Sequence, residues 1–190
     1  MKSLQERILK DGCVTDNHIL SVDSFLNHQI DIAFYNEIGK EFYRIFQGAG
    51  VNKILTVEAS GIGIACITAQ YFNVPVVFAK KSKSENISND FYKTKVESFT
   101  YKKPYDIIVC KKYLNANDRV LVLDDFLANG QAMLGLLAIL KEAGAQVAGA
   151  GAVIEKGFQN GGKTLRGMGI NLHSLAVIQE MNQNGIVFED

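Results

Sequence analysis

The stretch from Arg119 to Ala132 constrains the fold more than any other part of the chain. Residues 120–123 form a short apolar run rich in β-branched side chains, which is typical of a strand buried on both faces. Two carboxylates, Asp124 and Asp125, follow at the point where such a strand would leave the sheet. A short loop containing a glycine then leads into a predicted helix over residues 131–141, with its large apolar side chains on one stripe. This order of strand, acids, turn and helix is typical of ligand-binding sites in open α/β sheets.

The polar groups at this turn predict a phosphorylated sugar as the ligand. Residues 126–130 form the predicted loop, and the free N–H groups of the helical turn after it suit a phosphate. Ionised carboxylates only accept hydrogen bonds, so Asp124 and Asp125 suit sugar hydroxyls or a hydrated magnesium ion. Phosphate on one side and hydroxyls on the other describe a ribose 5-phosphate. The residues alone leave a second interpretation open, in which the acids cap the helix or are solvated loop residues.

Composition restricts the class of protein. The chain has 190 residues, 47% of them hydrophobic, which fits a single globular domain over residues 1–190. Twenty basic and twenty acidic side chains give a net charge of zero, which argues against nucleic-acid or membrane-surface binding. The three cysteines are too few for a disulfide framework, and Cys66 and Cys110 lie in apolar runs that predict buried thiols. The charged amino terminus lacks the apolar core of a signal peptide and no apolar run reaches membrane-spanning length, so we expect a cytoplasmic enzyme.

Strands and helices alternate along the chain, which predicts an α/β fold with a mainly parallel sheet covered by helices on both faces. The amphipathic helix over residues 31–46 is the clearest element, with Asp31 as its cap and glycines closing it. A shorter helix at the amino terminus places Leu4, Ile8 and Leu9 on one apolar edge. The predicted strands lie at residues 53–57, 76–79, 120–123, 146–154 and 172–178, with an edge strand or part of a covering lobe at 186–188.

A second turn rich in glycine follows the first predicted strand. Residues 58–63 separate that strand from a predicted helix over residues 64–72, so another group of backbone N–H donors is available for an anion. Lys80 and Lys81 come after the next strand, either as a solvated charge run or as a contact for the negative charge that grows on a leaving group. Residues 82–105 are polar and predict a mobile ribbon in an otherwise compact domain.

The strand with two acids, the loop, the glycine and the following helix resemble the phosphoribosyl pyrophosphate (PRPP) binding motif of type I phosphoribosyltransferases. The turn from Glu58 to Gly61 is similar to the pyrophosphate loop of the same family. Hydroxyl residues usually flank the glycine of the PRPP motif, whereas here Ala128 and Ala132 occupy those places. That variant resembles the purine branch of the family that acts on xanthine, and the resemblance extends over nearly all of the chain.

The resemblance implies a role for each part of the site. Asp124 and Asp125 would hold the ribose and act as the catalytic carboxylates. A hood over the base, formed by residues 1–30 and part of the carboxyl terminus, and a flexible loop would complete the type I phosphoribosyltransferase fold. The residues implied for PRPP binding are Ala128, Asn129, Gly130, Gln131, Ala132, Glu58, Ala59, Ser60, Gly61 and Lys81. Those implied for purine binding are Leu20, Asn27 and Lys156.

The reaction implied is transfer of the 5-phosphoribosyl group from PRPP to xanthine, which gives xanthosine 5′-monophosphate (XMP) and pyrophosphate in purine salvage. Mg²⁺ would accompany PRPP and pyrophosphate, and no residue is assigned as a metal ligand. The expected partners are the two small-molecule substrates and a second copy in a homodimer, without nucleic acid or membrane.

Alternative functions remain open at this point. One is hypoxanthine or guanine transfer, for which Lys156 would serve equally, and another is a PRPP-sensing regulator without catalysis. A generic Rossmann nucleotide-binding protein is disfavoured, because no G-x-G-x-x-G opens the first strand–helix unit. No residue is assigned to deprotonate the base.

Overall fold

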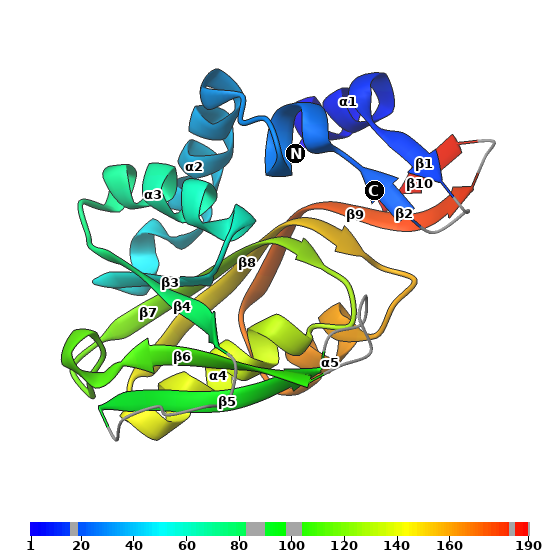
Figure 1. Ribbon diagram of the computed structural model, residues 1–190. Coiled ribbons are helices and arrows are strands. Elements are labelled where there is room, and N and C mark those ends of the chain that lie inside the picture. Colours follow the sequence, from blue (N-terminus) through cyan, green and yellow to red (C-terminus); the bar gives the residue numbers. More distant parts are fainter. Residues whose placement is uncertain (16–18, 83–89, 98–103, 183–184, 190) are drawn as a thin grey trace.

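A mixed β-sheet lies at the centre of the computed structural model (Figure 1). The structure describes residues 1–15, 19–82, 90–97, 104–182 and 185–189. In these ranges the sheet has eight strands in the order β10-β9-β8-β7-β3-β4-β6-β5. The strands are β3 (Lys53–Val57), β4 (Val76–Ser82), β5 (Phe91–Glu97), β6 (Pro104–Cys110), β7 (Arg119–Leu127), β8 (Gln146–Lys156), β9 (Leu172–Asn182) and β10 (Gly185–Phe188). Neighbouring strands from β4 through β3, β7 and β8 to β9 run parallel, which confirms the expected sheet.

The two edges of the sheet are antiparallel. β10 pairs with the end of β9, and β6 pairs with both β4 and β5. β5 and β6 form the ribbon expected in this part of the chain. The rest of the predicted mobile segment, residues 83–89 and 98–103, lies outside the described residues.

Two pairs of helices cover the two faces of the sheet, with α2 and α3 on one side and α4 and α5 on the other (Figure 1). Leu121 and Leu123 of β7 belong to the hydrophobic cluster that contains α2 and α3 side chains, whereas Val120 and Val122 belong to the cluster that contains α4 side chains. All four are fully buried, as the apolar run predicted for a strand covered on both faces. The helices are α2 (Ile32–Phe46), α3 (Ser60–Phe72), α4 (Gln131–Ala143) and α5 (Gly161–Gly167).

The structure confirms the helices predicted over residues 31–46 and 131–141, which are α2 and α4. The Asp31 side chain accepts a hydrogen bond from the Phe34 N–H at 3.1 Å and caps α2. α4 begins after Gly130 (φ 77°) and ends before Gly144 (φ 70°), two positions whose left-handed backbone favours glycine. Its predicted apolar stripe, Met133, Leu136, Leu137 and Leu140, is buried.

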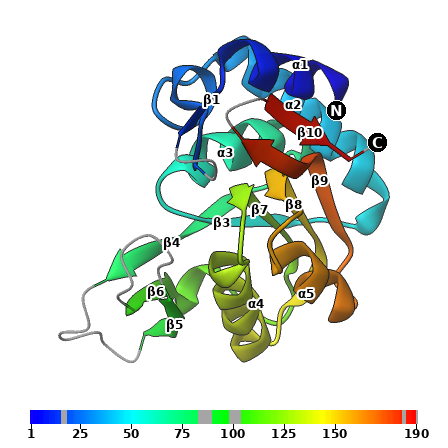
Figure 2. The same ribbon diagram turned by 90° about the vertical axis from the view of Figure 1, so that its right-hand side faces the viewer.

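The amino-terminal part of the chain lies over one end of the sheet. It contains α1 (Lys2–Asp11), β1 (Cys13–Thr15), β2 (Ile19–Ser21) and the short π-helix η1 (Asp23–Asn27). α1 contacts β9 and β10, and Figure 2 shows α1, β1 and β10 gathered at the same end of the molecule. Leu4 and Ile8 are fully buried, but Leu9 is 58% exposed, so the apolar edge of α1 is narrower than predicted.

One of the two predicted buried thiols is exposed. Cys66 lies on the outer side of α3, where Ile64, Ala65 and Ala69 form the buried side, and Cys110 is half-buried at the end of β6. The prediction for Cys66 was wrong because the apolar run of α3 is wider than the face it buries. Within the described part of the chain we find no helix with the length and hydrophobicity needed to cross a bilayer.

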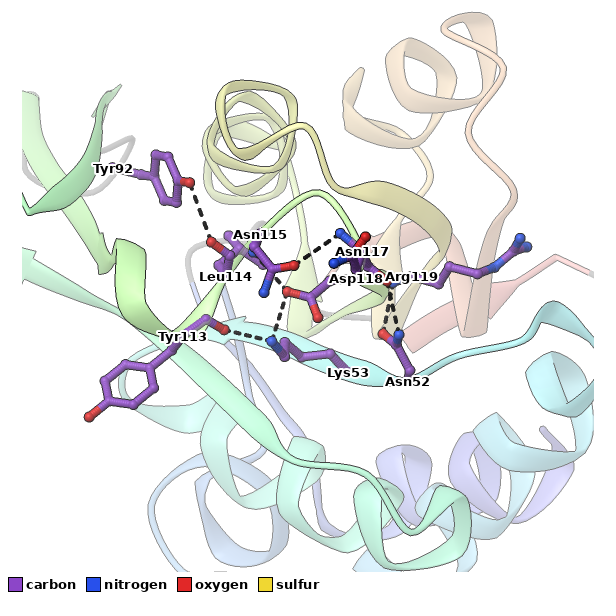
Figure 3. A network of polar contacts seen from close by, with 9 residues as sticks. All are labelled: Asn52, Lys53, Tyr92, Tyr113, Leu114, Asn115, Asn117, Asp118 and Arg119. Carbon is purple, nitrogen blue, oxygen red and sulfur yellow. Dashed lines mark hydrogen bonds and ion pairs between the residues drawn. The ribbon is translucent and has the colours of Figure 1, made fainter.

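A polar network fixes the amino ends of β3 and β7 (Figure 3). Asp118, which is 7% exposed, accepts hydrogen bonds from Lys53 Nζ at 2.7 Å and from the Asn115 N–H at 2.8 Å. Asn52 Oδ1 accepts from the Arg119 N–H at 2.8 Å. These bonds tie the starts of two parallel strands together, at the opposite end of β7 from its two carboxylates.

Candidate active site

Two buried carboxylates lie side by side near the carboxyl end of β7. Asp124 and Asp125 are 7% and 9% exposed, and the Asp125 N–H donates to Asp124 Oδ1 at 3.0 Å. Burial, together with the charge of Asp125, raises the pKa of Asp124 well above its ordinary value. Asp124 therefore binds a proton more tightly than a solvated aspartate does.

The sequence predicted that the strand ends before these carboxylates, and this prediction was wrong. β7 continues to Leu127, and Asp124 lies opposite Ala152 of β8 in the ladder. The predicted loop over residues 126–130 is therefore shortened to residues 128–130. This correction matters for the site, because a paired strand holds the carboxylates more rigidly than a loop would.

The charges of the two carboxylates act on two tyrosines. Burial and then the charge of Asp125 raise the pKa of Tyr35 to about 12, while burial and then the charge of Asp124 raise the pKa of Tyr105. Consecutive strand side chains point to opposite faces, and the two carboxylates accordingly influence different tyrosines, one on α2 and one on β6. Neither tyrosine was predicted as a site residue, because Tyr35 belongs to an ordinary amphipathic stripe and Tyr105 to a polar interval without a motif.

The turn after β3 lies against the carboxylates. α3 begins at Ser60 and not at residue 64, so most of the predicted glycine turn is the first turn of a helix. A Cβ on Gly61 would lie 2.2 Å from Thr56 Oγ1 and 3.5 Å from Asp124 Oδ1, so this position has room only for glycine. The first turn of a helix presents N–H groups and a positive dipole end, which places an anion-binding feature directly beside Asp124.

Glu58 ties this turn to β4. Its N–H donates to the Ala79 carbonyl at 3.1 Å, and its Oε1 accepts from the Lys81 N–H at 2.6 Å. Lys81 was predicted to follow the strand, but it lies within β4. Its side chain is exposed, and its Nζ lies 5.6 Å from the centroid of the Tyr105 ring. Burial raises the pKa of Asp124, and the positive charge of Lys81 partly offsets that rise. The structure therefore brings the positive charge of Lys81 to the carboxylate pair.

The loop between β7 and α4 is supported by α5. The Gly161 N–H donates to the Ala128 carbonyl at 3.1 Å, and a Cβ on Gly130 would lie 3.1 Å from the Gly161 Cα. A Cβ on Gly161 would lie 2.3 Å from the Ala128 oxygen, so the two backbones touch only because both glycines lack side chains. Asn129 is half-buried and Gln131 is exposed at the start of α4. The shape of the predicted phosphate loop thus depends on α5, a contact that the sequence did not reveal.

The residues predicted to bind the base differ in exposure. Lys156 ends β8, and burial lowers its pKa. Asn27 is the last residue of η1 and is exposed. Leu20 is 7% exposed and belongs to the hydrophobic cluster of the amino-terminal elements, so it can offer a ligand only a small part of its surface.

An ion pair with a buried carboxylate lies directly before Lys156 in the chain. Glu155 Oε1 and Oε2 accept from Arg166 Nη1 and Nη2, both at 2.8 Å, and Oε2 also accepts from the Ser174 hydroxyl. Burial raises the pKa of Glu155, but the hydrogen bonds from Arg166 and Ser174 outweigh it and leave the pKa lowered. A Cβ on Gly162 would lie 1.8 Å from Glu155 Oε1. The pair joins β8 and β9 to α5, the helix that supports the phosphate loop.

Residues 22–164 match the family model described as the phosphoribosyl transferase domain. The chain belongs to the phosphoribosyltransferase family. The matched region contains the carboxylate pair, both predicted phosphate turns and Lys156, so the match covers the elements that build the site.

Relatives of high identity extend over nearly the whole phosphoribosyltransferase chain. It is 61% identical to xanthine phosphoribosyltransferase of Lachnoclostridium phytofermentans, over 96% of this chain and 94% of that protein. It is 56% identical to the protein of the same name from Ruminiclostridium cellulolyticum, over 100% of both chains. It is 54% identical to that from Clostridioides difficile, over 99% of this chain and 100% of that protein. The predicted family is confirmed.

Solved adenine phosphoribosyltransferases share the fold at low identity. The enzyme from Leishmania donovani has a TM-score of 0.74 at 15% identity, covering 96% of this chain and 83% of that chain. The enzyme from Saccharomyces cerevisiae has a TM-score of 0.73 at 17% identity, covering 92% of this chain and 99% of that chain. At these identities the likeness concerns the fold alone, and it confirms the type I phosphoribosyltransferase architecture.

The phosphoribosyltransferase site brings two of the predicted PRPP residues, Gly61 and Lys81, to the carboxylate pair. Gly61 approaches Asp124 directly, Lys81 acts on it by charge, and the Ala128–Gly130 loop follows at the end of the same strand. Among the described residues, no group of three or more His, Cys, Asp or Glu side chains could hold a metal ion by itself.

We expect Arg166→Met to destabilise the protein by about 1–3 kcal/mol near neutral pH, because the buried carboxylate of Glu155 loses its charged donor. The pKa of Glu155 is lowered from its ordinary value of 4.5, so the pair stabilises the fold above that pH and the contribution is lost as the pH falls through the folded-state pKa. Urea titrations of both proteins at about pH 7 and about pH 3.5 should therefore show a smaller difference in unfolding free energy at the lower pH.

The matched control is Lys163→Met on the exposed side of α5, which should change stability by less than about 0.5 kcal/mol. An equal loss for Arg166→Met at both pH values would mean that the ion pair does not stabilise the fold.

Proposed function

We propose that this phosphoribosyltransferase transfers the 5-phosphoribosyl group of PRPP to xanthine, forming XMP and pyrophosphate in purine salvage. The proposal rests on the buried carboxylate pair of β7, which lies against the first turn of α3 and directly precedes the loop into α4. The names of the relatives, which are 53–61% identical over nearly their full length, supply the identity of the base.

The carboxylate pair is suited to a ribose that gains positive charge. Displacement at the anomeric carbon weakens the bond to pyrophosphate and leaves positive charge on the sugar, which a nearby carboxylate stabilises. Asp124 and Asp125 lie buried at this place, where carboxylate oxygens can accept hydrogen bonds from the two ribose hydroxyls. Because both belong to a paired strand, they hold the sugar without rearranging as the reaction proceeds.

Two further elements would receive the phosphates. The 5′-phosphate would accept hydrogen bonds from the backbone between Ala128 and Ala132, since the side chains there lack hydroxyl groups. Pyrophosphate would lie at the turn from Glu58 to Gly61, where Lys81 adds a positive charge. Negative charge grows on the pyrophosphate as it leaves, so these contacts strengthen during the reaction.

The base would be held between β8 and the hood. Lys156 would donate a hydrogen bond to a carbonyl oxygen of xanthine. The Asn27 amide can both donate and accept hydrogen bonds, and it would contact another edge of the purine ring. The partial burial that lowers the pKa of Lys156 also strengthens a hydrogen bond from its ammonium group.

We propose that Mg²⁺ binds together with PRPP. A buried pair of carboxylates offers two acidic ligands, and Mg²⁺ in phosphoryl sites commonly uses one or two carboxylates, several waters and the oxygens of the substrate. The ion would neutralise charge on the pyrophosphate group. Chelation of Mg²⁺ by EDTA should lower the turnover rate by about a hundredfold, and added Mg²⁺ should restore it. An unchanged rate in EDTA would remove the ion from the proposal.

We also propose that the enzyme is a cytoplasmic homodimer. The support for the homodimer is that phosphoribosyltransferases of this length are commonly dimers, and the net charge of zero argues against a membrane-surface location. Sedimentation velocity at micromolar concentration should give a single species of twice the chain mass of 20.9 kDa. A species of the chain mass alone would contradict the homodimer.

The proposed reaction is tested by identifying its products. Incubation with PRPP, Mg²⁺ and xanthine should yield XMP and pyrophosphate in equal amounts, as measured by chromatography and a coupled pyrophosphate assay. Pyrophosphate without XMP would mean that PRPP is hydrolysed, and neither product would contradict the proposed activity.

A further inference from the structure

The carboxyl end of η1 is fastened to α2 by several contacts. The rings of Phe25 and Phe34 meet edge to face with their centroids 5.7 Å apart. The Arg7 guanidinium lies over both rings, 5.0 Å and 5.6 Å from their centroids, and pairs with Asp31 at 3.0 Å. The hood segment that ends in Asn27 is therefore packed in place by α1 and α2.

Tyr35 makes the contact nearest to Asn27. Its hydroxyl donates a hydrogen bond to the carbonyl of Leu26, the residue immediately before Asn27. Tyr35 is 1% exposed and Leu26 is fully buried, so water cannot replace this bond. Since burial and the charge of Asp125 raise the pKa of Tyr35 to about 12, the phenol stays protonated and remains a donor at neutral pH. The bond fixes the backbone from which the exposed Asn27 side chain projects.

The ring of Tyr35 also touches the helix that carries the predicted pyrophosphate turn. A Cβ on Gly63 would lie 2.8 Å from Tyr35 Cε2 and 3.4 Å from Ile30 Cδ1. The first turn of α3 and the end of the hood segment thus meet at the same ring. The negative charge of Asp125 also acts on the Tyr35 phenol, so Tyr35 interacts with the hood segment, with α3 and with the carboxylate pair.

We propose that Tyr35 is a positioning residue that sets the place of Asn27 relative to the carboxylate pair and so determines how tightly the purine binds. Its hydroxyl holds the hood segment, and its ring lies against α3, the helix whose Gly61 approaches Asp124. This inference rests on the proposed function, because it assigns Asn27 to the base. The inference gives a role to Tyr35, which is too deeply buried to touch the substrate. Its contacts hold the hood segment at a fixed distance from the ribose site.

The first test is Tyr35→Phe, which removes only the hydroxyl. We expect the KM for xanthine to rise about tenfold, while the KM for PRPP changes less than about twofold and the protein stays folded. Tyr43→Phe on the same helix, whose ring packs edge to face on Phe72, is the matched control and should change neither KM. Equal changes in both KM values for Tyr35→Phe would overturn the inference.

A double-mutant cycle separates positioning from general loosening. If Tyr35 acts through Asn27, Tyr35→Phe should add less than about a twofold further change in the xanthine KM when Asn27→Ala is already present. Independent, multiplicative effects would overturn the inference. Asn27 is exposed, so Asn27→Ala should fold even if Tyr35→Phe does not, and an unchanged xanthine KM in Asn27→Ala would also overturn it.

The same assay distinguishes a failure of the proposed function from a failure of the inference about Tyr35. Absence of xanthine turnover by the wild-type enzyme would contradict the proposed function and this inference together. Wild-type turnover with no effect of Tyr35→Phe would contradict this inference alone.

Discussion

Replacing Asp125 with asparagine is expected to lower kcat by about a hundredfold or more while the protein stays folded. Asparagine keeps the size of the side chain but removes the negative charge that would stabilise the ribose. It also removes the charge that, after burial, raises the pKa of Asp124, so the repulsion between two buried carboxylates is relieved. Thermal unfolding should therefore occur at the same temperature or higher. Steady-state kinetics at saturating PRPP and xanthine, with thermal melting of the same samples, measure both effects.

Asp118→Asn is the matched control, because Asp118 is a buried aspartate immediately before the first residue of β7. Asp118 accepts from Lys53 and from the Asn115 N–H within the network of Figure 3. Its replacement should lower the unfolding free energy by about 1–3 kcal/mol and leave kcat within about twofold. Together the two variants should separate activity from stability along one strand. An Asp125→Asn enzyme with wild-type kcat would remove Asp125 from the catalytic site.

Replacing Lys156 with alanine is expected to raise the KM for xanthine by about ten- to a hundredfold and to leave the KM for PRPP nearly unchanged. A charged hydrogen bond to the base accounts for a change of that size. The pKa of Lys156 is lowered by burial, so the ammonium group lies in a partly desolvated place where the loss of such a bond matters. Initial rates with each substrate varied in turn, at saturation of the other, provide the two constants.

Lys163→Ala provides the control for this variant. Lys163 is an exposed lysine on α5, seven residues further along the chain, and its removal should leave both KM values within about twofold. If Lys156→Ala raised both KM values equally, Lys156 would not be a base-binding residue.

The central part of the fold could be predicted because each of its signals is local. The apolar run over residues 120–123 is continuous, and a strand that alternates between two hydrophobic clusters requires that pattern. The helix over residues 31–46 repeats its apolar side chains at helical spacing and begins with a capping aspartate. The carboxylate pair could be found for the same reason, since it directly follows the recognisable apolar run of residues 120–123.

The ends of these elements could not be predicted, because they depend on pairing with distant parts of the chain. Phe126 and Leu127 resemble the start of a loop, yet they pair with Ile154 and Glu155 of β8 and extend β7 past the acids. α3 likewise begins four residues early, at a turn whose Gly61 fits against Thr56. Neither contact can be predicted from the secondary-structure propensity of the residues near these ends.

The supporting residues of the site were missed for a related reason. Tyr35 and Arg166 occupy ordinary positions on helices, and only the folded chain brings them to Leu26 and Glu155. Leu20 was predicted as a base contact, and its nearly complete burial in the hydrophobic cluster limits the surface it can offer. Residues that only position other residues belong to no sequence motif. Their roles can be seen from their contacts in the folded chain, but not from their spacing in the sequence.

The most direct test of the central claim is the specificity constant, kcat/KM, measured with PRPP and Mg²⁺ for xanthine, guanine, hypoxanthine and adenine in parallel. The proposed function predicts that xanthine has the highest value, by about tenfold or more over each other base. A higher value for guanine or hypoxanthine would leave the PRPP site in place but contradict xanthine as the substrate. Measurable PRPP binding without turnover of any base would contradict catalysis itself and favour a PRPP-sensing protein.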